Sequence, residues 1–320
     1  MRLRLGTRGS ALALAQARTI KAALEADGAD CELVVVRSEG DTSSASLASI
    51  GGTGVFAGAL RRSLLDGGCD LVVHSLKDLP VAPAPGLVVA AVPAREDARD
   101  ALCARDGLTF DTLPAGARVG TGSPRRRAQI ADRRPDLVAV DLRGNVDTRL
   151  RRVRDGDLDG VVLSAAGLAR LGRSDAVTEL LPLGTWPTAA GQGALAIEVR
   201  EADAWHLTAP GGEPTEIGAA VTRLTDPDAE DAATAERTVL GRLEAGCSAP
   251  IGVASAVTTD TAELWAAVHR PGGGERIDRR RSLRFAPGDR RSALLAAAEA
   301  LAAELLDAGA ADLAPLGASA

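Results

Sequence analysis

The sequence is poor in aromatic residues and almost free of lysine. Only 2% of its 320 residues are aromatic and tyrosine is absent, so the core must be built from aliphatic side chains. Lysine and arginine together number 37, but only Lys21 and Lys77 are lysines. Arginine is therefore the default cation of this protein, and its frequency alone carries little functional weight. Lys77, by contrast, is conspicuous.

Residues that bind structural metals are few and scattered. The four cysteines include no CxxC pair, and the three histidines form no ligand cluster. Their positions are Cys31, Cys69, Cys103, Cys247, His74, His206 and His269. We expect no metal site and a protein with reduced thiols.

Two further absences bear on location and partners. No uncharged stretch has the length of a membrane span, and no apolar segment precedes the strand-like run Arg2–Leu5. The formal net charge is -6, whereas nucleic-acid-binding proteins usually carry a basic face that neutralises phosphates. We therefore expect a cytoplasmic protein that binds neither a membrane nor a nucleic acid.

Positive charge is nevertheless concentrated in two segments. Arginines cluster between Arg125 and Arg134, and again between Arg143 and Arg154. A basic region on an acidic protein indicates a small anionic ligand.

Short apolar runs alternate with amphipathic patterns along the first two thirds of the chain. The runs predict buried strands, and stretches such as Ala11–Ala26 predict helices between them. The predicted strands are Leu33–Val36, Leu71–Val73, Leu87–Val92, Val138–Val140 and Val161–Leu163. This alternation is typical of α/β layers with largely parallel sheets, here arranged as two lobes with a cleft between them.

The last third of the chain has a different pattern. We expect an irregular segment from Glu198 to Glu216 and then a smaller α+β domain. Its predicted helices are Thr215–Leu224, Ala229–Leu243 and Arg291–Ala308, and its predicted strands are Ile251–Val257 and Glu263–Val268. The predicted division is residues 1–95 and 194–212 for lobe one, 96–193 for lobe two, and 213–320 for the α+β domain. The chain crosses between lobes near Pro93–Arg99 and Thr188–Gly193, where hinge motion is expected.

Three helix starts share a design suited to anions. Ser10, Ser123 and Asn145 are each predicted to cap a helix, which leaves free backbone N–H groups beside an arginine. Pro124 fits the first helical position, where the missing N–H costs nothing. One capped helix is a weak signal because such caps are common. Three of them at strand ends of α/β lobes favour a ligand site.

The run His74–Pro80 places Ser75, Lys77 and Asp78 at the carboxyl end of a strand. Beside cations, Asp78 can stay ionised and stabilise positive charge on a substrate, or pass a proton to a leaving amine. The alternative is a carboxylate that is satisfied by local backbone groups. His74 is expected to be structural.

Cys247 lies on a loop of small residues between a helix and a strand. Such a cysteine is exposed enough to be modified, whereas the other three cysteines lie beside apolar runs and are expected to be inert. By its own spacing, Cys247 is only a loop cysteine, and its context has to decide its role.

That context carries a resemblance to a known family. Thr234–Arg237 followed by Arg242–Gly252 resembles the cofactor-attachment signature of the porphobilinogen deaminase (hydroxymethylbilane synthase) family. Further family motifs appear in the same order: His74–Pro80, Arg95–Asp97, Gly120–Arg126, Leu142–Asn145, Ala166–Leu168 with Arg170, and Gly191–Ala194. The resemblance spans roughly residues 3–255 and is carried by motifs rather than by composition.

The resemblance implies two periplasmic-binding-protein-like lobes and a third domain that presents the cysteine. It implies a dipyrromethane cofactor bound to Cys247 through a thioether, with Asp78 as the catalytic residue that contacts pyrrole nitrogens. The implied enzyme is a transferase of tetrapyrrole (haem) biosynthesis. It condenses four porphobilinogen molecules head to tail with loss of ammonia, and releases hydroxymethylbilane by hydrolysis. Nothing in the sequence demands more than a monomer.

The resemblance also implies individual ligand contacts. Each pyrrole carries an acetate and a propionate, which guanidinium groups bind in bidentate geometry. The implied cofactor contacts are Ser75, Lys77, Asp78, Thr121, Ser123, Arg125, Arg126, Arg143 and Arg149, in addition to Cys247. The implied substrate contacts are Arg8, Ser10, Arg170 and Gln192.

The chain departs from the family pattern in two segments. Ser49 and Thr53 occupy positions where many relatives have lysines, so loop-lysine contacts to the pyrrole chain are not expected here. Glu198–Ala233 is longer than usual by about a dozen residues, a size common for a surface loop.

Two other functions stay open at this stage. Two lobes with anion-ready helix starts also suit a solute-binding or effector-binding protein without catalysis, which would have no use for Cys247 or Asp78. A transferase acting on another carboxylated amine, with a structural Cys247, is the second alternative.

Overall fold

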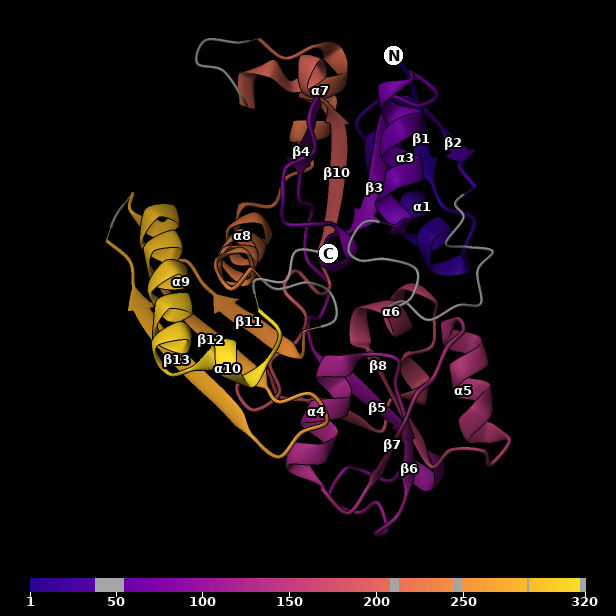
Figure 1. Cartoon of the computed structure of the whole chain (residues 1–320). Coiled ribbons are helices and arrows are strands. Elements are labelled where there is room, and N and C mark those ends of the chain that lie inside the picture. The colour runs from indigo at the N-terminus through magenta and orange to yellow at the C-terminus, as the bar shows by residue number, and fades with distance from the viewer. Residues whose placement is uncertain (38–54, 208–212, 245–248, 287, 317–320) are drawn as a thin grey trace. The chain divides into compact units, whose positions relative to one another are not determined.

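The computed structural model describes residues 1–37, 55–207, 213–244, 249–286 and 288–316. The chain divides into two compact units, and most of their helices and strands are labelled in Figure 1. Unit 1 comprises Met1–Arg95 and Ala194–Glu230, and unit 2 comprises Glu96–Gly193 and Asp231–Ala320. The chain therefore passes between the units within the first predicted crossing, at the end of the second, and once more inside a helix.

Unit 1 is built on a five-stranded sheet. Its strands are β1 (Arg2–Thr7), β2 (Asp30–Val35), β3 (Leu71–Ser75), β4 (Leu87–Ala91) and β10 (Leu195–Arg200), in the order β2-β1-β3-β10-β4. β1 runs parallel to β2 and β3, whereas β10 runs antiparallel to β3 and β4. The helical elements are α1 (Ala11–Ala26), α3 (Val55–Leu65), α7 (Glu216–Thr222) and the 3-10 turns η1 (Leu76–Asp78) and η4 (Glu201–Leu207).

The first part of unit 2 is a second five-stranded sheet. Its strands are β5 (Asp100–Ala104), β6 (Arg118–Gly120), β7 (Val138–Val140), β8 (Gly160–Ser164) and β9 (Glu179–Leu181), in the order β7-β6-β8-β5-β9. β6 runs parallel to β7 and β8, and β5 runs antiparallel to β8 and β9. The helical elements are α4 (Pro124–Arg133), α5 (Val146–Arg154), α6 (Ala165–Arg170) and the 3-10 turns η2 (Arg105–Gly107) and η3 (Ser174–Ala176).

The two sheets share one topology. In each, the central strand, β1 or β6, lies between two parallel strands, β2 and β3 or β7 and β8. An antiparallel strand, β10 or β5, follows, and β4 or β9 forms the far edge. The antiparallel strands, β10 and β5, are the ones that begin directly after a crossing. The predicted architecture of two α/β lobes with a smaller α+β domain is confirmed.

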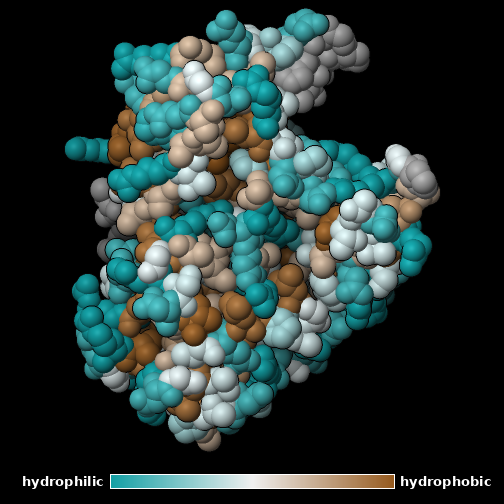
Figure 2. Space-filling model, turned by 180° about the vertical axis from the view of Figure 1, so that it is seen from behind, coloured by the Kyte–Doolittle hydropathy of each residue, from teal (hydrophilic) through white to brown (hydrophobic). Residues whose placement is uncertain are grey.

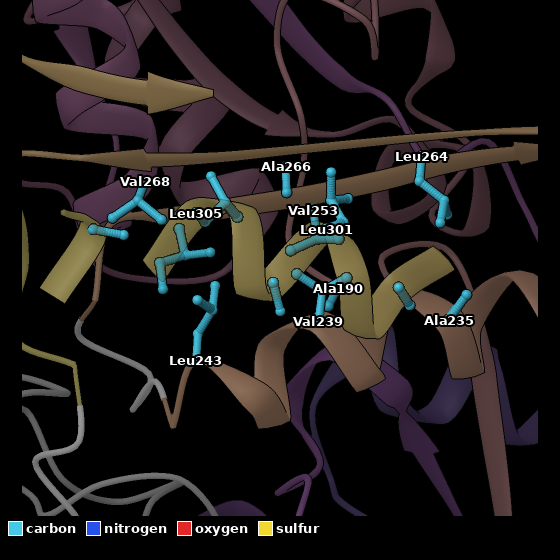
Figure 3. Packing of buried hydrophobic residues seen from close by; sticks show 14 of the residues in the cluster. Ala190, Ala235, Val239, Leu243, Val253, Leu264, Ala266, Val268, Leu301 and Leu305 are labelled. Atoms are coloured by element: carbon cyan, nitrogen blue, oxygen red, sulfur yellow. The ribbon is translucent and has the colours of Figure 1, made fainter. Parts of the chain in front are cut away.

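The rest of unit 2 is a three-stranded antiparallel sheet with helices packed against it. The elements are α8 (Pro227–Arg242), β11 (Ile251–Val257), β12 (Thr261–His269), β13 (Arg276–Arg284), α9 (Arg290–Asp307) and α10 (Ala310–Leu313). Figure 3 shows Val239 from α8, Leu301 and Leu305 from α9 and Val268 from β12 pointing toward one another. Aliphatic side chains fill this core, as the low aromatic content predicts.

This C-terminal part is fastened to lobe two. The Gly191 N–H donates to Glu236 of α8 at 2.7 Å, so the second crossing is bound to the helix that precedes Cys247. His269, at the end of β12, lies 2.5 Å from Asp132 of α4, and the Gly274 N–H donates to the other oxygen of Asp132 at 2.7 Å.

The structure corrects the prediction for the segment after the second crossing. Glu198–Arg200 is not irregular but completes β10, and Glu198 is almost fully buried there. The helix predicted at Thr215–Leu224 is α7, capped by Thr215. Its Ala220 and Val221 pack in the core of lobe one, so residues 213–230 group with unit 1. The division predicted at residue 212 otherwise stays a prediction.

Charged and apolar residues are mixed on the surface. Figure 2 shows hydrophobic residues interspersed among hydrophilic ones on the face that it presents. Among the described residues, no helix combines the length and the apolar character that a membrane crossing requires.

Candidate active site

In unit 1, the predicted site residues lie at one edge of the sheet. β1 and β3 are parallel neighbours, with Leu5 opposite Leu71, so their carboxyl ends meet at the same edge. Ser10 follows β1 and caps α1, where its Oγ accepts the Ala13 N–H at 3.3 Å. Arg8 lies between the strand and this cap. The predicted helix start is therefore confirmed.

The end of β3 carries the second group. Ser75 is the last residue of the strand, and Lys77 and Asp78 belong to η1 directly after it. Asp78 is exposed, so its carboxylate is accessible from solvent. The Gln16 side chain of α1 donates to Ser75 Oγ at 2.7 Å. Sequence reasoning missed Gln16, which is buried and ties the two strand ends together.

A buried charged cluster supports this edge from within the sheet. Glu198 of β10 binds the Arg61 guanidinium of α3 at 2.8 Å, and His74 Nε2 lies 3.2 Å from it. Burial alone would raise the pKa of Glu198, but the nearby His74 ring and the hydrogen bonds from Arg61 outweigh burial and lower it. His74 therefore has the structural role expected of it, one residue before Ser75.

In unit 2, α4 presents the next group. Ser123 caps the helix by accepting the Arg126 N–H at 3.4 Å, and Pro124 is the first helical residue, as predicted. The buried Thr121 accepts the Ser123 N–H through Oγ1 at 3.2 Å. A Cβ at Gly122 would lie 2.7 Å from the Leu142 carbonyl oxygen, so the close approach of these segments requires glycine.

Arg125 and Arg126, in the first turn of α4, point into the protein. Both are buried, and both bind the carboxylate of Asp100, at 2.9 and 2.6 Å respectively. Burial lowers the pKa of Arg125 despite the nearby carboxylate. Sequence reasoning missed Asp100.

Two further arginines lie close to Arg126. Asn145 caps α5 by accepting the Thr148 N–H at 2.8 Å, and Arg149 on this helix donates to the Gly144 carbonyl at 2.8 Å. Burial lowers the pKa of Arg149, and the positive charges of Arg126 and Arg143 lower it further. The Asp141 carboxylate offsets part of this repulsion, and a bound anion would stabilise the Arg149 guanidinium further. This arrangement fits a ligand with several carboxylates.

Arg170 and Gln192 make contacts inside the protein. Arg170 donates to the Gly193 carbonyl at 2.7 Å, and burial lowers its pKa. The buried Gln192 amide donates to the Ala98 carbonyl at 2.9 Å and to Asp100 at 2.8 Å. Both residues, predicted to bind substrate, thus also hold the crossing segments.

Cys247 lies outside the described residues, as do Ser49 and Thr53. The residues that flank Cys247 are anchored, because Leu243 and Ile251 lie in the core of the C-terminal domain. Cys31 and Cys103 are buried, and burial raises their pKa values to about 11 and about 12. Cys69 is buried as well. The burial of these three thiols fits the low reactivity expected of them.

The predicted residues thus form two groups, each within its own unit. Unit 1 holds Arg8, Ser10, Ser75, Lys77 and Asp78, and unit 2 holds Thr121, Ser123, Arg125, Arg126, Arg143, Arg149, Arg170 and Gln192. Within the described ranges, no group of His, Cys, Asp and Glu side chains has the arrangement of a metal site.

Comparisons with known proteins cover nearly the whole chain. Residues 3–208 match the family model "porphobilinogen deaminase, dipyromethane cofactor binding domain", and residues 231–301 match "porphobilinogen deaminase, C-terminal domain". The chain is 55% identical to the porphobilinogen deaminase of Leifsonia xyli over 98% of this chain and 94% of that protein. It is 48% identical to the porphobilinogen deaminase of Cutibacterium acnes over 99% and 98%.

Solved structures of low identity also resemble the chain. One is a putative methionine-binding lipoprotein from Bacillus subtilis, with a TM-score of 0.41 and 14% identity, covering 72% of this chain and 92% of that one. Another is an arginine-specific periplasmic binding protein from Salmonella typhimurium, with a TM-score of 0.37 and 17% identity, covering 72% and 96%.

Proposed function

This chain belongs to the porphobilinogen deaminase family, and from that premise we propose how its residues perform the reaction. The enzyme condenses four porphobilinogen molecules head to tail, with loss of ammonia, and releases hydroxymethylbilane. The chemistry proceeds on a dipyrromethane cofactor, for which we propose Cys247 as the attachment point. The alternative of a binding protein without catalysis is disfavoured by the relatives named above, which carry the name of the enzyme.

The residues of unit 2 fit the cofactor. Dipyrromethane carries carboxylates, and the cluster of Arg126, Arg143 and Arg149 is a set of cations whose mutual repulsion a carboxylate relieves. This cluster is the observation that carries the proposal. The hydroxyl groups of Thr121 and Ser123 add hydrogen-bond donors at the same strand end. When bound, the cofactor supplies the pyrrole carbon to which the first substrate is joined.

The residues of unit 1 fit the reacting centre. Loss of ammonia leaves positive charge on the substrate, and a carboxylate stabilises such charge. Asp78 is exposed at the end of β3, beside Ser75 and Lys77, and is the group we assign to this role. Arg8 and Ser10, at the neighbouring strand end, are assigned to the carboxylates of the incoming substrate.

We assign Arg170 and Gln192 to substrate binding. Both residues also contact the segments in which the chain passes from one unit to the other. Arg170 donates to the Gly193 carbonyl, and Gln192 donates to the Asp100 carboxylate. A substrate carboxylate that contacts Arg170 would therefore act on the segments that join the units. Such coupling suits an enzyme that must accommodate a growing chain.

Incubation with porphobilinogen tests the activity directly. We expect one ammonia to be released per porphobilinogen consumed, together with a product that closes to a cyclic porphyrinogen. A binding protein would retain porphobilinogen without releasing ammonia, and that result would refute the enzymatic function.

The oligomeric state and the cellular location of the enzyme are proposed separately. We propose that the enzyme acts as a cytoplasmic monomer. Light scattering during size exclusion should give the mass of one chain, and a stable dimer mass would contradict this.

A further inference from the structure

A carboxylate without an assigned role lies beneath the arginines of α4. Asp100 is the first residue of β5 and pairs with Ser164 at the carboxyl end of β8. Because β8 runs parallel to β6, Asp100 lies at the same sheet edge as the strand end that leads into α4. Its side chain is fully buried.

Four side chains donate to this carboxylate. Arg126 and Gln192 bind Oδ1 at 2.6 and 2.8 Å, and Arg125 and the Trp186 indole bind Oδ2, each at 2.9 Å. Burial alone would raise the pKa of Asp100, but the two guanidinium groups outweigh burial and hold it far below its usual value. The Asp100 carboxylate therefore stays ionised.

Both arginines use part of their guanidinium groups for acceptors within the protein. Nη1 of Arg125 donates to Asp100, and also to the Pro187 carbonyl at 3.2 Å, so protein acceptors surround it. Arg126 donates through Nη1 to the Val162 carbonyl at 3.1 Å and through Nη2 to Asp100. Its buried Nε finds no acceptor among the described residues. Arg126 thus retains a buried donor for an anion.

The charge balance points to the same conclusion. Two guanidinium groups and one carboxylate leave this buried cluster with one positive charge in excess. An unpaired buried charge is costly, and a ligand carboxylate would neutralise it. Without Asp100, the excess would be two charges.

We propose that Asp100 is a positioning residue for the anion site. Asp100 fixes the Arg126 guanidinium so that the remaining donor of Arg126 faces the bound carboxylate. It also leaves the cluster with one excess positive charge, which a single ligand carboxylate neutralises. This inference rests on the site proposed above, because it assigns Arg126 to the cofactor.

Two variants of the intact enzyme test this role: Asp100→Asn removes the charge, and Asp100→Glu keeps it but shifts the carboxylate. Asp159→Asn is the matched control, because Asp159 also binds an arginine of lobe two, Arg105, at 2.8 Å. It lies at the amino end of β8, about 16 Å along the sheet from Asp100 at the usual rise per residue. Cofactor loading is measured by intact mass, turnover per loaded enzyme by product formation, and folding by thermal unfolding.

We expect both Asp100 variants to fold and to lose at least ~10-fold in cofactor loading rate or in turnover, the factor for one charge-assisted hydrogen bond. Asp159→Asn should lower thermal stability while keeping loading and turnover. Loading and turnover of folded Asp100 variants equal to those of Asp159→Asn would overturn the positioning role. Failure of both variants to fold would also overturn it, because Asp100 would then serve folding alone.

Arg143→Leu in parallel separates this inference from the proposed site. If Arg143→Leu is impaired and the Asp100 variants are not, only the positioning role fails. If Arg143→Leu also loads and turns over normally, the proposed anion site itself is wrong.

Discussion

At the scale of single residues, we propose that Asp78 stabilises the reacting centre, and this role should be separable from cofactor binding. Asp78→Asn keeps the shape of the side chain but removes its charge. We expect normal cofactor loading, while turnover falls ~100- to 1000-fold, the usual cost of losing a charge-stabilising group. Steady-state kinetics together with intact mass measure both quantities.

The control for this prediction is Asp66→Asn. Asp66 is an exposed carboxylate in the turn that follows α3 (Val55–Leu65), before the start of β3 at Leu71, whereas Asp78 follows the end of that strand. It should behave as wild type. Near-normal turnover of Asp78→Asn would refute the catalytic role.

The residue scale also shows what sequence could and could not reveal. The caps Ser10, Ser123 and Asn145 were predicted, because capping depends on residues three positions apart. Asp100 was missed because its donors come from positions 125, 126, 186 and 192, which no local pattern connects. Its only signal was an acidic residue at the start of an apolar run.

At the scale of elements, the crossing segment Thr188–Gly193 has no room for a side chain at Gly193. Its φ is +87°, and a Cβ there would lie 2.4 Å from the Glu96 carbonyl oxygen. Gly193→Ala adds this clash to a left-handed strain of ~1–3 kcal/mol. We expect a loss of unfolding free energy above that range, together with reduced turnover, in urea unfolding and kinetic assays.

The variant Gly156→Ala separates the cost of the steric clash from the cost of the left-handed backbone strain. Gly156 has a φ of +80° but open space around its Cβ position. It should lose only ~1 kcal/mol, the cost of strain alone, and keep its activity. Equal losses for the two variants would show that the close approach at Gly193 is unimportant.

Elements were predicted well where apolar runs were strong. The predicted strand at Val138–Val140 and the predicted helix at Ala11–Ala26 match β7 and α1. β13 was missed because its exposed, arginine-rich sequence lacks an apolar alternation. The end of β10 was missed because Glu198 reads as a surface residue, whereas Arg61 and His74 make its burial possible.

At the scale of the whole molecule, buried carboxylates make stability depend on pH. The folded pKa of Glu198 is lowered, so its stabilising contribution is complete above its unfolded pKa and is lost as pH falls through the folded value. Glu198→Gln should lose about 3 kcal/mol at pH 7. It should also show a shallower decline in melting temperature than wild type below about pH 4.5.

The control is Glu32→Gln, since Glu32 forms an exposed pair with Arg2. This variant should change stability by less than about 1 kcal/mol and keep the wild-type pH dependence. A Glu198→Gln profile parallel to that of wild type would contradict the assignment of acid sensitivity to this cluster.

The whole-molecule architecture followed from the order of patterns along the chain. Alternating strands and helices predicted two lobes, and the two sheets indeed share one strand order. The grouping of α7 with lobe one was not predictable, because it depends on the packing of Ala220 and Val221 against the core formed by β1, β3 and β10.

The central claim is that Cys247 carries a covalent dipyrromethane on which the substrate units are joined. Mass spectrometry of the denatured, intact protein tests it most directly. Wild-type protein should exceed its sequence mass by one unit of two linked pyrroles, whereas Cys247→Ser should have its bare sequence mass and no turnover. A fully active wild-type protein without added mass would contradict the account.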